Sequence, residues 1–448
     1  MKRSIPAVAA LAAVASLALA ACSGGTSGGT PTSQASGGTD TGVATAPAAP
    51  VELTVSGWSL ATTPEFKVLA DAFHAKHSNV TVTLKEYDAS KYNDLITADL
   101  AANAAPDIIT QKNVSYVTVF APKLVDVSDL VAGLPQGING VKSYEVDGKQ
   151  YALPYRNDSW VLFYNKDLFD KAGVAIPDGS WTWDDYAAAA KQLTTKLKGA
   201  GSQALGTYQH SWQSVIQGFA NSQTPGANIL SGKYDYMKPY YQRALDLQSA
   251  GAQVDAGTIT TSKLTYQAEF GKQQAAMMPM GSWFVATLIA QQKSGDADKF
   301  AWGFAPIPQL DKSTTGTSAT PLTFGDPTGF GINKAIDAKK MQAAKDFLAF
   351  AASEDAAKAL AQIGITPALT SDTVATTYFA TAGAPTDALS KFAWTTHKTA
   401  PENPTDKNTA AVQKILGDAH TAIMSGSSSI DAALAQATKR VHDEVGLG

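Results

Sequence analysis

Alternating strand and helix patterns at the start of the main body of the chain constrain its fold more than any other feature. Apolar and polar residues alternate over 51–56, as they do on a strand with one buried face. A helix follows over 63–73, where apolar residues recur at helical spacing; we expect Thr63 to cap it and Glu65 to be a first-turn acid. The order continues with a strand at 80–84, a helix at 91–104 and a strand at 107–109. This succession predicts an α/β fold with a mainly parallel sheet.

The same order predicts where a ligand binds. In open α/β sheets, ligands bind beyond the carboxyl ends of the strands, where loops and helix starts converge. The segments that follow the first and third strands are 57–59 and 110–113. A second α/β unit begins near 161–164 and continues into a helix, where Thr182 and Asp185 stand at the spacing of a capping box.

The first residues are typical of a secretory signal rather than of a folded domain. Lys2 and Arg3 precede an apolar stretch over 5–20, and the sequence LAAC at 19–22 resembles a bacterial lipobox. The apolar run is too short for a membrane span. We therefore expect residues 1–21 to be removed and Cys22 to carry lipid, which anchors the protein to the outer face of the cell membrane. A plain secreted protein is the alternative, but Cys22 is the only cysteine in the chain.

Composition argues against several other kinds of site. Residues 22–50 consist almost entirely of Gly, Ser, Thr, Ala and Pro, which predicts a flexible tether, and the rest of the chain is long enough for two lobes. The net charge of -4, without a basic stripe, argues against nucleic acid as a partner. A lone cysteine forms no intrachain disulfide, and His74 and His77 have no further ligands near them in the sequence. We therefore expect no metal and no cofactor.

A series of short segments after Val51 stands in the same order as in one known family. They are GW at 57–58, APDII at 105–109, YALP at 151–154, FYNKDLF at 163–169, WTWDD at 181–185, AMMPMGSW at 276–283 and GINK at 331–334. Together they make most of the chain after Val51 similar to the extracellular solute-binding proteins of family 1, which include maltose-binding protein.

This resemblance implies a periplasmic-binding-protein-like fold of type II, with two α/β lobes joined by hinge crossings and a ligand cleft between them. It implies a first lobe of 51–155 and 328–365 and a second lobe of 156–327 and 366–448. It also implies a monomer that delivers a small-molecule ligand to the permease subunits of an ABC importer. Low net charge and many aromatic residues favour a neutral sugar as that ligand.

A sugar site needs aromatic platforms, and these point to the tryptophans. Trp283 lies in a segment that resembles the family's binding tryptophan, so we expect a stacking platform there rather than core packing. Trp58 follows the first strand and is either a wall of the cleft or a packed loop residue. Trp212 lies where the family often places contacts from the second lobe, and a core role is equally open. We expect Trp181 and Trp183 to form a hydrophobic staple.

The polar candidates lie at strand ends and crossings. Asp158 stands where maltose-binding protein has a ligand-binding glutamate, and a carboxylate can accept hydrogen bonds from two sugar hydroxyls; a loop or N-cap aspartate is the alternative. Asn157 lies beside it as a helper. Gln111 and Asn113 follow the third strand, and their amides either bind the ligand or stabilise the loop. Asp326 precedes a proline near the second crossing, where it also suits a turn.

These observations favour a binding protein that performs no chemistry and works by lobe closure. One alternative is an exported glycoside-acting enzyme, with Asp184 and Asp185, or Asp158 and Asp326, as its paired carboxyls. Adjacent Asp184 and Asp185 project in different directions from one helix turn, which does not suit that role. A lipoprotein sensor or adhesin is the other alternative.

Overall fold

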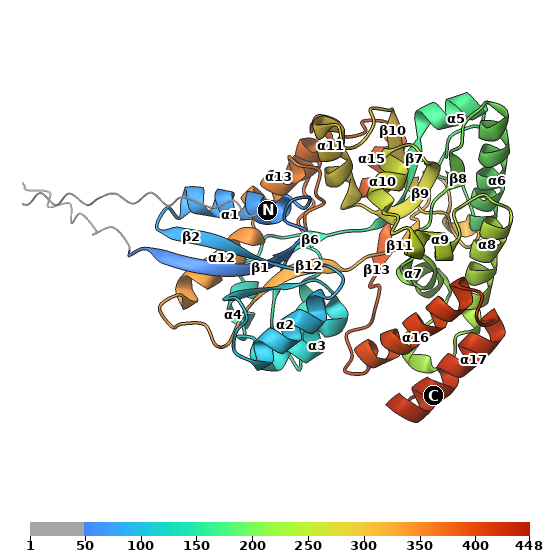
Figure 1. Cartoon of the computed structure of the whole chain (residues 1–448). Coiled ribbons are helices and arrows are strands. Elements are labelled where there is room, and N and C mark those ends of the chain that lie inside the picture. The colour runs from blue at the N-terminus through green and yellow to red at the C-terminus, as the bar shows by residue number, and fades with distance from the viewer. Residues whose placement is uncertain (1–48) are drawn as a thin grey trace, which may run out of the picture. The chain divides into compact units, whose positions relative to one another are not determined.

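The computed structural model describes residues 49–448 (Figure 1). The predicted signal peptide, the lipidation site Cys22 and nearly all of the predicted tether lie outside the described residues. Within the described part of the chain, no helix is both long and apolar enough to cross a membrane.

The first sheet has five strands and contains the predicted N-terminal unit. Their order is β2 (Val80–Tyr87), β1 (Val51–Trp58), β3 (Ile108–Gln111), β12 (Pro327–Ile332) and β6 (Leu153–Asn157). β1 pairs in parallel with β2 and β3, as the alternation of strands and helices predicted. β12 is antiparallel to both of its neighbours, β3 and β6, although it comes from a distant part of the chain.

Helices pack around this sheet and form its apolar core with the strands. They are α1 (Glu65–Lys76), α2 (Tyr92–Ala101), α3 (Val117–Phe120), α4 (Ser128–Val131), α12 (Met341–Ala351) and α13 (Glu354–Ala361). The prediction that Thr63 caps α1 is wrong. Pro64 occupies the N-cap with φ -72°, because the proline ring already holds the backbone in the helical region, and no side chain caps this end.

The second sheet has four strands in the order β10 (Trp302–Pro306), β7 (Trp160–Asn165), β9 (Ala275–Gly281) and β8 (Leu205–Thr207). β7 is antiparallel to β10 and to β9, and only β8 and β9 run in parallel. The expectation of mainly parallel pairing therefore holds for the N-terminal strands and not for this sheet. Two short ribbons complete the strands: β11 (Leu322–Phe324) with β13 (Lys398–Ala400), and β4 (Glu145–Val146) with β5 (Lys149–Gln150).

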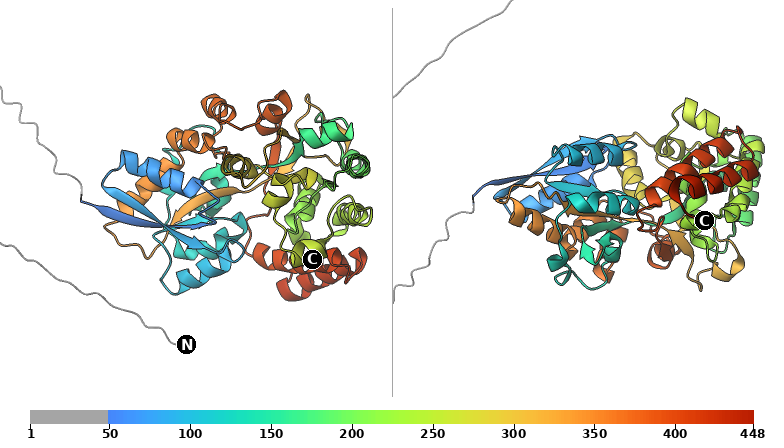
Figure 2. Two further views of the ribbon diagram at one scale, coloured as in Figure 1. Left: turned by 45° about the horizontal axis from the view of Figure 1, so that its top comes forward. Right: turned by 90° about the horizontal axis from the view of Figure 1, so that it is seen from below.

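Most of the helices within residues 49–448 accompany the second sheet. They are α5 (Lys166–Ala172), α6 (Trp183–Gly199), α7 (Ser214–Gln223), α8 (Lys238–Ser249), α9 (Ala256–Thr261), α10 (Tyr266–Gly271), α11 (Phe284–Ser294), α14 (Asp372–Phe379), α15 (Ala388–Thr395), α16 (Thr409–Met424) and α17 (Ile430–Arg440). The capping box predicted for α6 is confirmed, since Thr182 and Asp185 each accept a hydrogen bond from the other's backbone N–H. The C-terminal helices α16 and α17 contribute to the apolar core that accompanies the second sheet (Figure 2).

The two sheets belong to separate apolar cores, which define two lobes. The chain leaves the first sheet after Asn157 and enters the second at Trp160, and it returns between Phe324 and Pro327. α13 contributes buried residues to both cores, so the chain passes between the lobes again near this helix. The exact limits assigned to each lobe from the resemblance stay a prediction.

Candidate ligand-binding site

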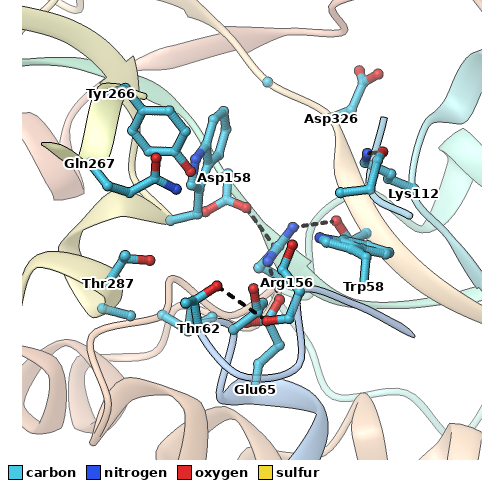
Figure 3. Close-up of a pocket in the computed structure, with 18 of the residues that line it drawn as sticks. Trp58, Thr62, Glu65, Lys112, Arg156, Asp158, Tyr266, Gln267, Thr287 and Asp326 are labelled. Carbon is cyan, nitrogen blue, oxygen red and sulfur yellow. Dashed lines mark hydrogen bonds and ion pairs between the residues drawn. The ribbon is translucent and has the colours of Figure 1, made fainter. Parts of the chain in front are cut away.

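A cavity of about 520 Å³ lies between strand ends and helix starts of the two lobes (Figure 3). This volume is within the range of small-molecule sites, roughly 300–1,000 Å³. Most of the predicted ligand residues line it, namely Trp58, Asn113, Asp158, Trp212, Trp283 and Asp326. The strand-end rule pointed to Trp58 and Asn113, and the family resemblance pointed to Asp158, Trp212 and Trp283.

Gln111 and Asn157 do not line this cavity. Gln111 is 1% exposed in β3, opposite Gly329 of β12, and neither polar atom of its side-chain amide has a partner within the described residues. Asn157 ends β6, where its backbone N–H donates to the carbonyl of Thr366 at 3.2 Å. Both side chains lie on strand residues whose immediate neighbours reach the cavity.

Arg156 sits between two buried carboxylates and holds them together. Its Nε lies 2.7 Å from Asp158 Oδ2, and its Nη1 forms an ion pair with Glu65 Oε1 (Figure 3). Its Nη2 donates to Thr328 Oγ1 at 3.0 Å. Asp158 and Glu65 are 3% and 0% exposed. Burial raises the pKa of both carboxyls, and the guanidinium opposes that rise.

The carboxylate of Asp158 is already engaged by protein groups. Besides the ion pair at Oδ2, its Oδ1 accepts a hydrogen bond from Ser282 Oγ at 2.8 Å. Ser282 directly follows β9, so Asp158 connects the first crossing to the second lobe. Glu65, expected only as a first-turn acid, does lie in the first turn of α1 and is in addition part of this buried cluster. No local pattern marks it, because its partner is distant in the sequence.

A second pair of acids, Asp326 and Glu402, lines the cavity. Asp326 Oδ1 accepts a hydrogen bond from the backbone N–H of Glu402 at 2.9 Å, while Oδ2 has no partner among residues 49–448. Burial raises the pKa of Glu402 to about 7, and burial together with Glu402 raises the pKa of Asp326 well above its ordinary value. The sequence did not single out Glu402, since PENP at 401–404 is typical of a plain loop.

Aromatic side chains form one wall of the cavity. Trp283 meets Trp160 edge to face with ring centroids 5.5 Å apart, and Trp212 lies 5.5 Å from Tyr266 in the same arrangement. Trp212 is 39% exposed, which is unusual for a large apolar side chain and leaves it available to a ligand. A Cβ on Gly281 would lie 1.8 Å from the indole of Trp283, so only glycine allows this ring position.

Trp58 lies on the opposite side of the cavity and is largely packed. It makes edge-to-face contacts with Phe66 and Tyr92 at 5.0 and 5.1 Å. Lys112 Nζ lies 5.3 Å from the Trp58 ring centroid and donates to the carbonyl of Ala89. Burial, and then the nearby charge of Arg156, lower the pKa of Lys112 to about 8. Lys112 therefore brings a partly desolvated cation to the cavity wall.

Comparison with known proteins gives three kinds of match. The family model described as bacterial extracellular solute-binding protein matches residues 57–358. A sugar transporter from Rhizobium etli, solved in an open conformation, superposes with a TM-score of 0.71 and is 32% identical, covering 88% of this chain and 99% of its own. Maltose-bound MalE3 of T. maritima superposes with a TM-score of 0.68 at 18% identity, covering 87% and 99% of the two chains.

Curated relatives match over a smaller part of the chain. A putative binding protein of Brucella abortus is 25% identical over 61% of this chain and 66% of its own length, so the match spans slightly less than two thirds of that relative. The melibiose/raffinose/stachyose-binding protein of Bacillus subtilis is 21% identical over 66% of this chain and 68% of its own. The sn-glycerol-3-phosphate-binding periplasmic protein of Yersinia enterocolitica is 30% identical over 34% and 36% of the two chains.

Proposed function

This chain belongs to the bacterial extracellular solute-binding proteins, and from that premise we propose that it captures a neutral sugar or oligosaccharide for an ABC importer. The observation that carries the proposal is the cavity between the lobes, where an aromatic wall faces several carboxyl groups. A sugar presents C–H faces to aromatic rings and hydroxyls to polar groups, so it matches both kinds of surface.

The charges around the cavity support a neutral ligand over an anionic one. The acids that line it are Glu65, Asp158, Asp326 and Glu402, and the cations are Arg156 and Lys112. Arg156 is already paired with two of the acids. A phosphate group would therefore find Arg156 already paired with acids, with Lys112 as the other cation among the lining residues.

An anionic ligand is the second candidate, because Lys112 forms no ion pair within the described residues and lines the cavity. A partial relative named for sn-glycerol 3-phosphate makes this candidate worth testing directly. A single partly desolvated ammonium is nevertheless a weak site for a dianion, which proteins usually bind with several donors.

The rest of the proposal concerns anchoring and mechanism. We infer that lipid on Cys22 holds the protein at the outer face of the membrane, that the protein acts as a monomer, and that lobe closure around the ligand presents it to the permease. The LAAC sequence at 19–22 and the two separate cores support these steps.

The proposal includes no catalysis. Family members are binding proteins; of the acid pairs that an enzyme would need, Asp184 and Asp185 do not line the cavity, and Asp158 is bound by Arg156 and Ser282. Asp185 is bound to Thr182 and Lys312, and the side chain of Asp184 is 96% exposed. Whether an ABC permease is encoded next to this chain distinguishes transport from a sensor or adhesin role, because only transport needs the permease.

A thermal-shift screen tests the ligand class. The probes are raffinose, maltose, mannitol and sn-glycerol 3-phosphate, each offered to the purified full-length chain with a parallel check for hydrolysis of the saccharides. A probe at 100 times its Kd should stabilise the protein by roughly 2.7 kcal/mol. Stabilisation by glycerol phosphate alone would contradict the neutral-sugar proposal, and saccharide turnover would contradict a pure binding role.

A further inference from the structure

The acids that line the cavity differ in what already binds them. Glu65 and Asp158 share the guanidinium of Arg156, and Asp158 also accepts from Ser282. Asp326 accepts the backbone N–H of Glu402. The side chain of Glu402, by contrast, forms no hydrogen bond or ion pair with any residue in the part of the chain that the structure describes, and burial raises its pKa.

The backbone around Glu402 is nevertheless firmly held. β13 ends at Ala400, whose carbonyl accepts the N–H of Gly325 at 3.1 Å, and the N–H of Glu402 itself donates to Asp326. On the other side, Thr409 Oγ1 donates to the carbonyl of Pro404 at 2.8 Å where α16 begins. An anchored backbone that carries an unpartnered, partly buried carboxyl into a cavity is the arrangement of a ligand-binding side chain.

We propose that Glu402 is a ligand-binding residue whose carboxylate accepts hydrogen bonds from hydroxyl groups of the bound saccharide. This inference rests on the proposed function and deepens it, since it names the acid that is available to the ligand. A desolvated carboxylate without a cation is costly, and two hydroxyl donors offset that cost by charge-assisted hydrogen bonds. The same carboxylate repels a phosphate group, which makes Glu402 a determinant of ligand charge as well.

The contacts of these acids also distinguish acids that position other groups from the acid that binds the ligand, a distinction that the sequence did not show. Asp158 positions Arg156 and Ser282 at the crossing between the lobes, and Asp326 positions the Glu402 loop through its Oδ1. Among residues 49–448, Asp326 and Glu65 each keep one carboxylate oxygen without a partner, whereas neither oxygen of Glu402 is bound by another group. Hydroxyl donors favour the ionised carboxyl, so binding lowers the pKa of Glu402 and saccharide affinity falls on acidification. The other titratable groups around the two acids are Tyr144, which Asp326 influences, and the cavity residues Glu65, Lys112, Arg156, Asp158, His210 and Tyr266.

Calorimetric titration of raffinose and maltose into the parent, Glu402→Gln and a control, Glu145→Gln, tests this role. Glu145 is an exposed acid of β4, so its variant should bind as the parent does. At pH 8 Glu402→Gln should bind at least about tenfold more weakly, as the loss of a hydrogen bond to a charged group implies. From pH 8 to pH 5.5 the affinity of the parent should fall, and that of Glu402→Gln should change less. Equal affinity of parent and Glu402→Gln at pH 8 would overturn the assignment.

Thermal melts without any probe provide an independent arm. The folded pKa of Glu402, about 7, lies above its ordinary value of 4.5, so the folded state binds more protons and is progressively destabilised as pH rises between these values. Glu402→Gln should therefore melt above the parent at pH 8 and close to it at pH 4.5. A lower melting temperature at pH 8 would show that Glu402 supports the fold, and the proposal would fail.

The outcomes distinguish this inference from the function on which it rests. Tight binding of sn-glycerol 3-phosphate by the parent, with no binding of saccharides, would overturn the neutral-sugar function. Saccharide binding that survives unchanged in Glu402→Gln would leave that function standing and overturn only the role of Glu402.

Discussion

Replacing Arg156 with methionine is the sharpest test of how the crossing between the lobes is built. Methionine keeps an unbranched apolar stem and removes the guanidinium, which leaves Glu65 and Asp158 buried at 0% and 3% exposure without their shared cation. Removing one partner of a buried ion pair costs about 3–5 kcal/mol. We therefore expect Arg156→Met to lower the free energy of unfolding by about that amount at pH 8.

The dependence on pH identifies the cause of this loss. Burial raises the pKa of both carboxyls, and the charge of Arg156 lowers it. Removing Arg156 therefore raises both pKa values further. The folded variant then holds protons that the unfolded chain has released, and its stability, relative to the parent, recovers as pH falls. Below the raised pKa values, each group recovers up to about 1.4 kcal/mol per pH unit until it is also protonated in the unfolded chain.

Urea unfolding at pH 8, 6.5 and 5, followed by tryptophan fluorescence and circular dichroism, measures both effects. Arg440→Met is the matched control, because Arg440 pairs with Asp418 and Glu444 at the surface and should cost about 0–1 kcal/mol. Exchanging all three buried residues, Glu65→Gln, Arg156→Met and Asp158→Asn, should recover much of the loss. A loss below about 1 kcal/mol for Arg156→Met at pH 8, or a loss that does not shrink on acidification, would refute the reasoning.

Three further predictions concern the ligand, the lobes and the anchor. Trp283→Ala should weaken saccharide binding by roughly ten- to a hundredfold, as a loss of about 1–3 kcal/mol of stacking implies, whereas a core role would instead cost about 3–5 kcal/mol of stability in calorimetric melts. Saccharide binding should reduce the radius of gyration in solution scattering and shift tryptophan emission; tight binding with neither change would exclude closure. Cys22→Ala should release the protein from the membrane fraction of cells, and equal retention would contradict lipid anchoring.

Local patterns were sufficient to predict the regular elements. The alternation over 51–56 became β1, and the capping box at Thr182 and Asp185 became the start of α6. Such features depend only on residues a few positions apart, so the sequence is enough to predict them. The wrong prediction of the N-cap at Thr63 also depends on adjacent residues. Thr63 and Pro64 were both candidates for the start of α1, and the helical backbone of Pro64 places the N-cap there.

The sequence predicted many of the residues that line the cavity, but not the role of each. Trp58 and Asn113 line it because strand ends converge, whereas Asp158, Trp212 and Trp283 were expected there from the family resemblance. The cluster around Asp158 could not be foreseen, because Ser282, which donates to Asp158, and Glu65, which shares Arg156 with it, come from distant elements. Asp158→Ala should therefore lower stability without ligand as well as affecting binding, because it leaves Arg156 partly unpaired.

The position of β12 in the middle of the first sheet has a consequence for biosynthesis. β12 separates β3 from β6, yet the ribosome makes it about 200 residues after β3, a delay of roughly 10–40 s at ~5–20 residues per second. During that interval β3 lacks one of its two neighbouring strands, and an unpaired strand edge is a template for aggregation. A purified chain truncated before residue 327 should therefore bind holdase chaperones on refolding, whereas the full-length chain, in which β12 closes the sheet, should bind them less.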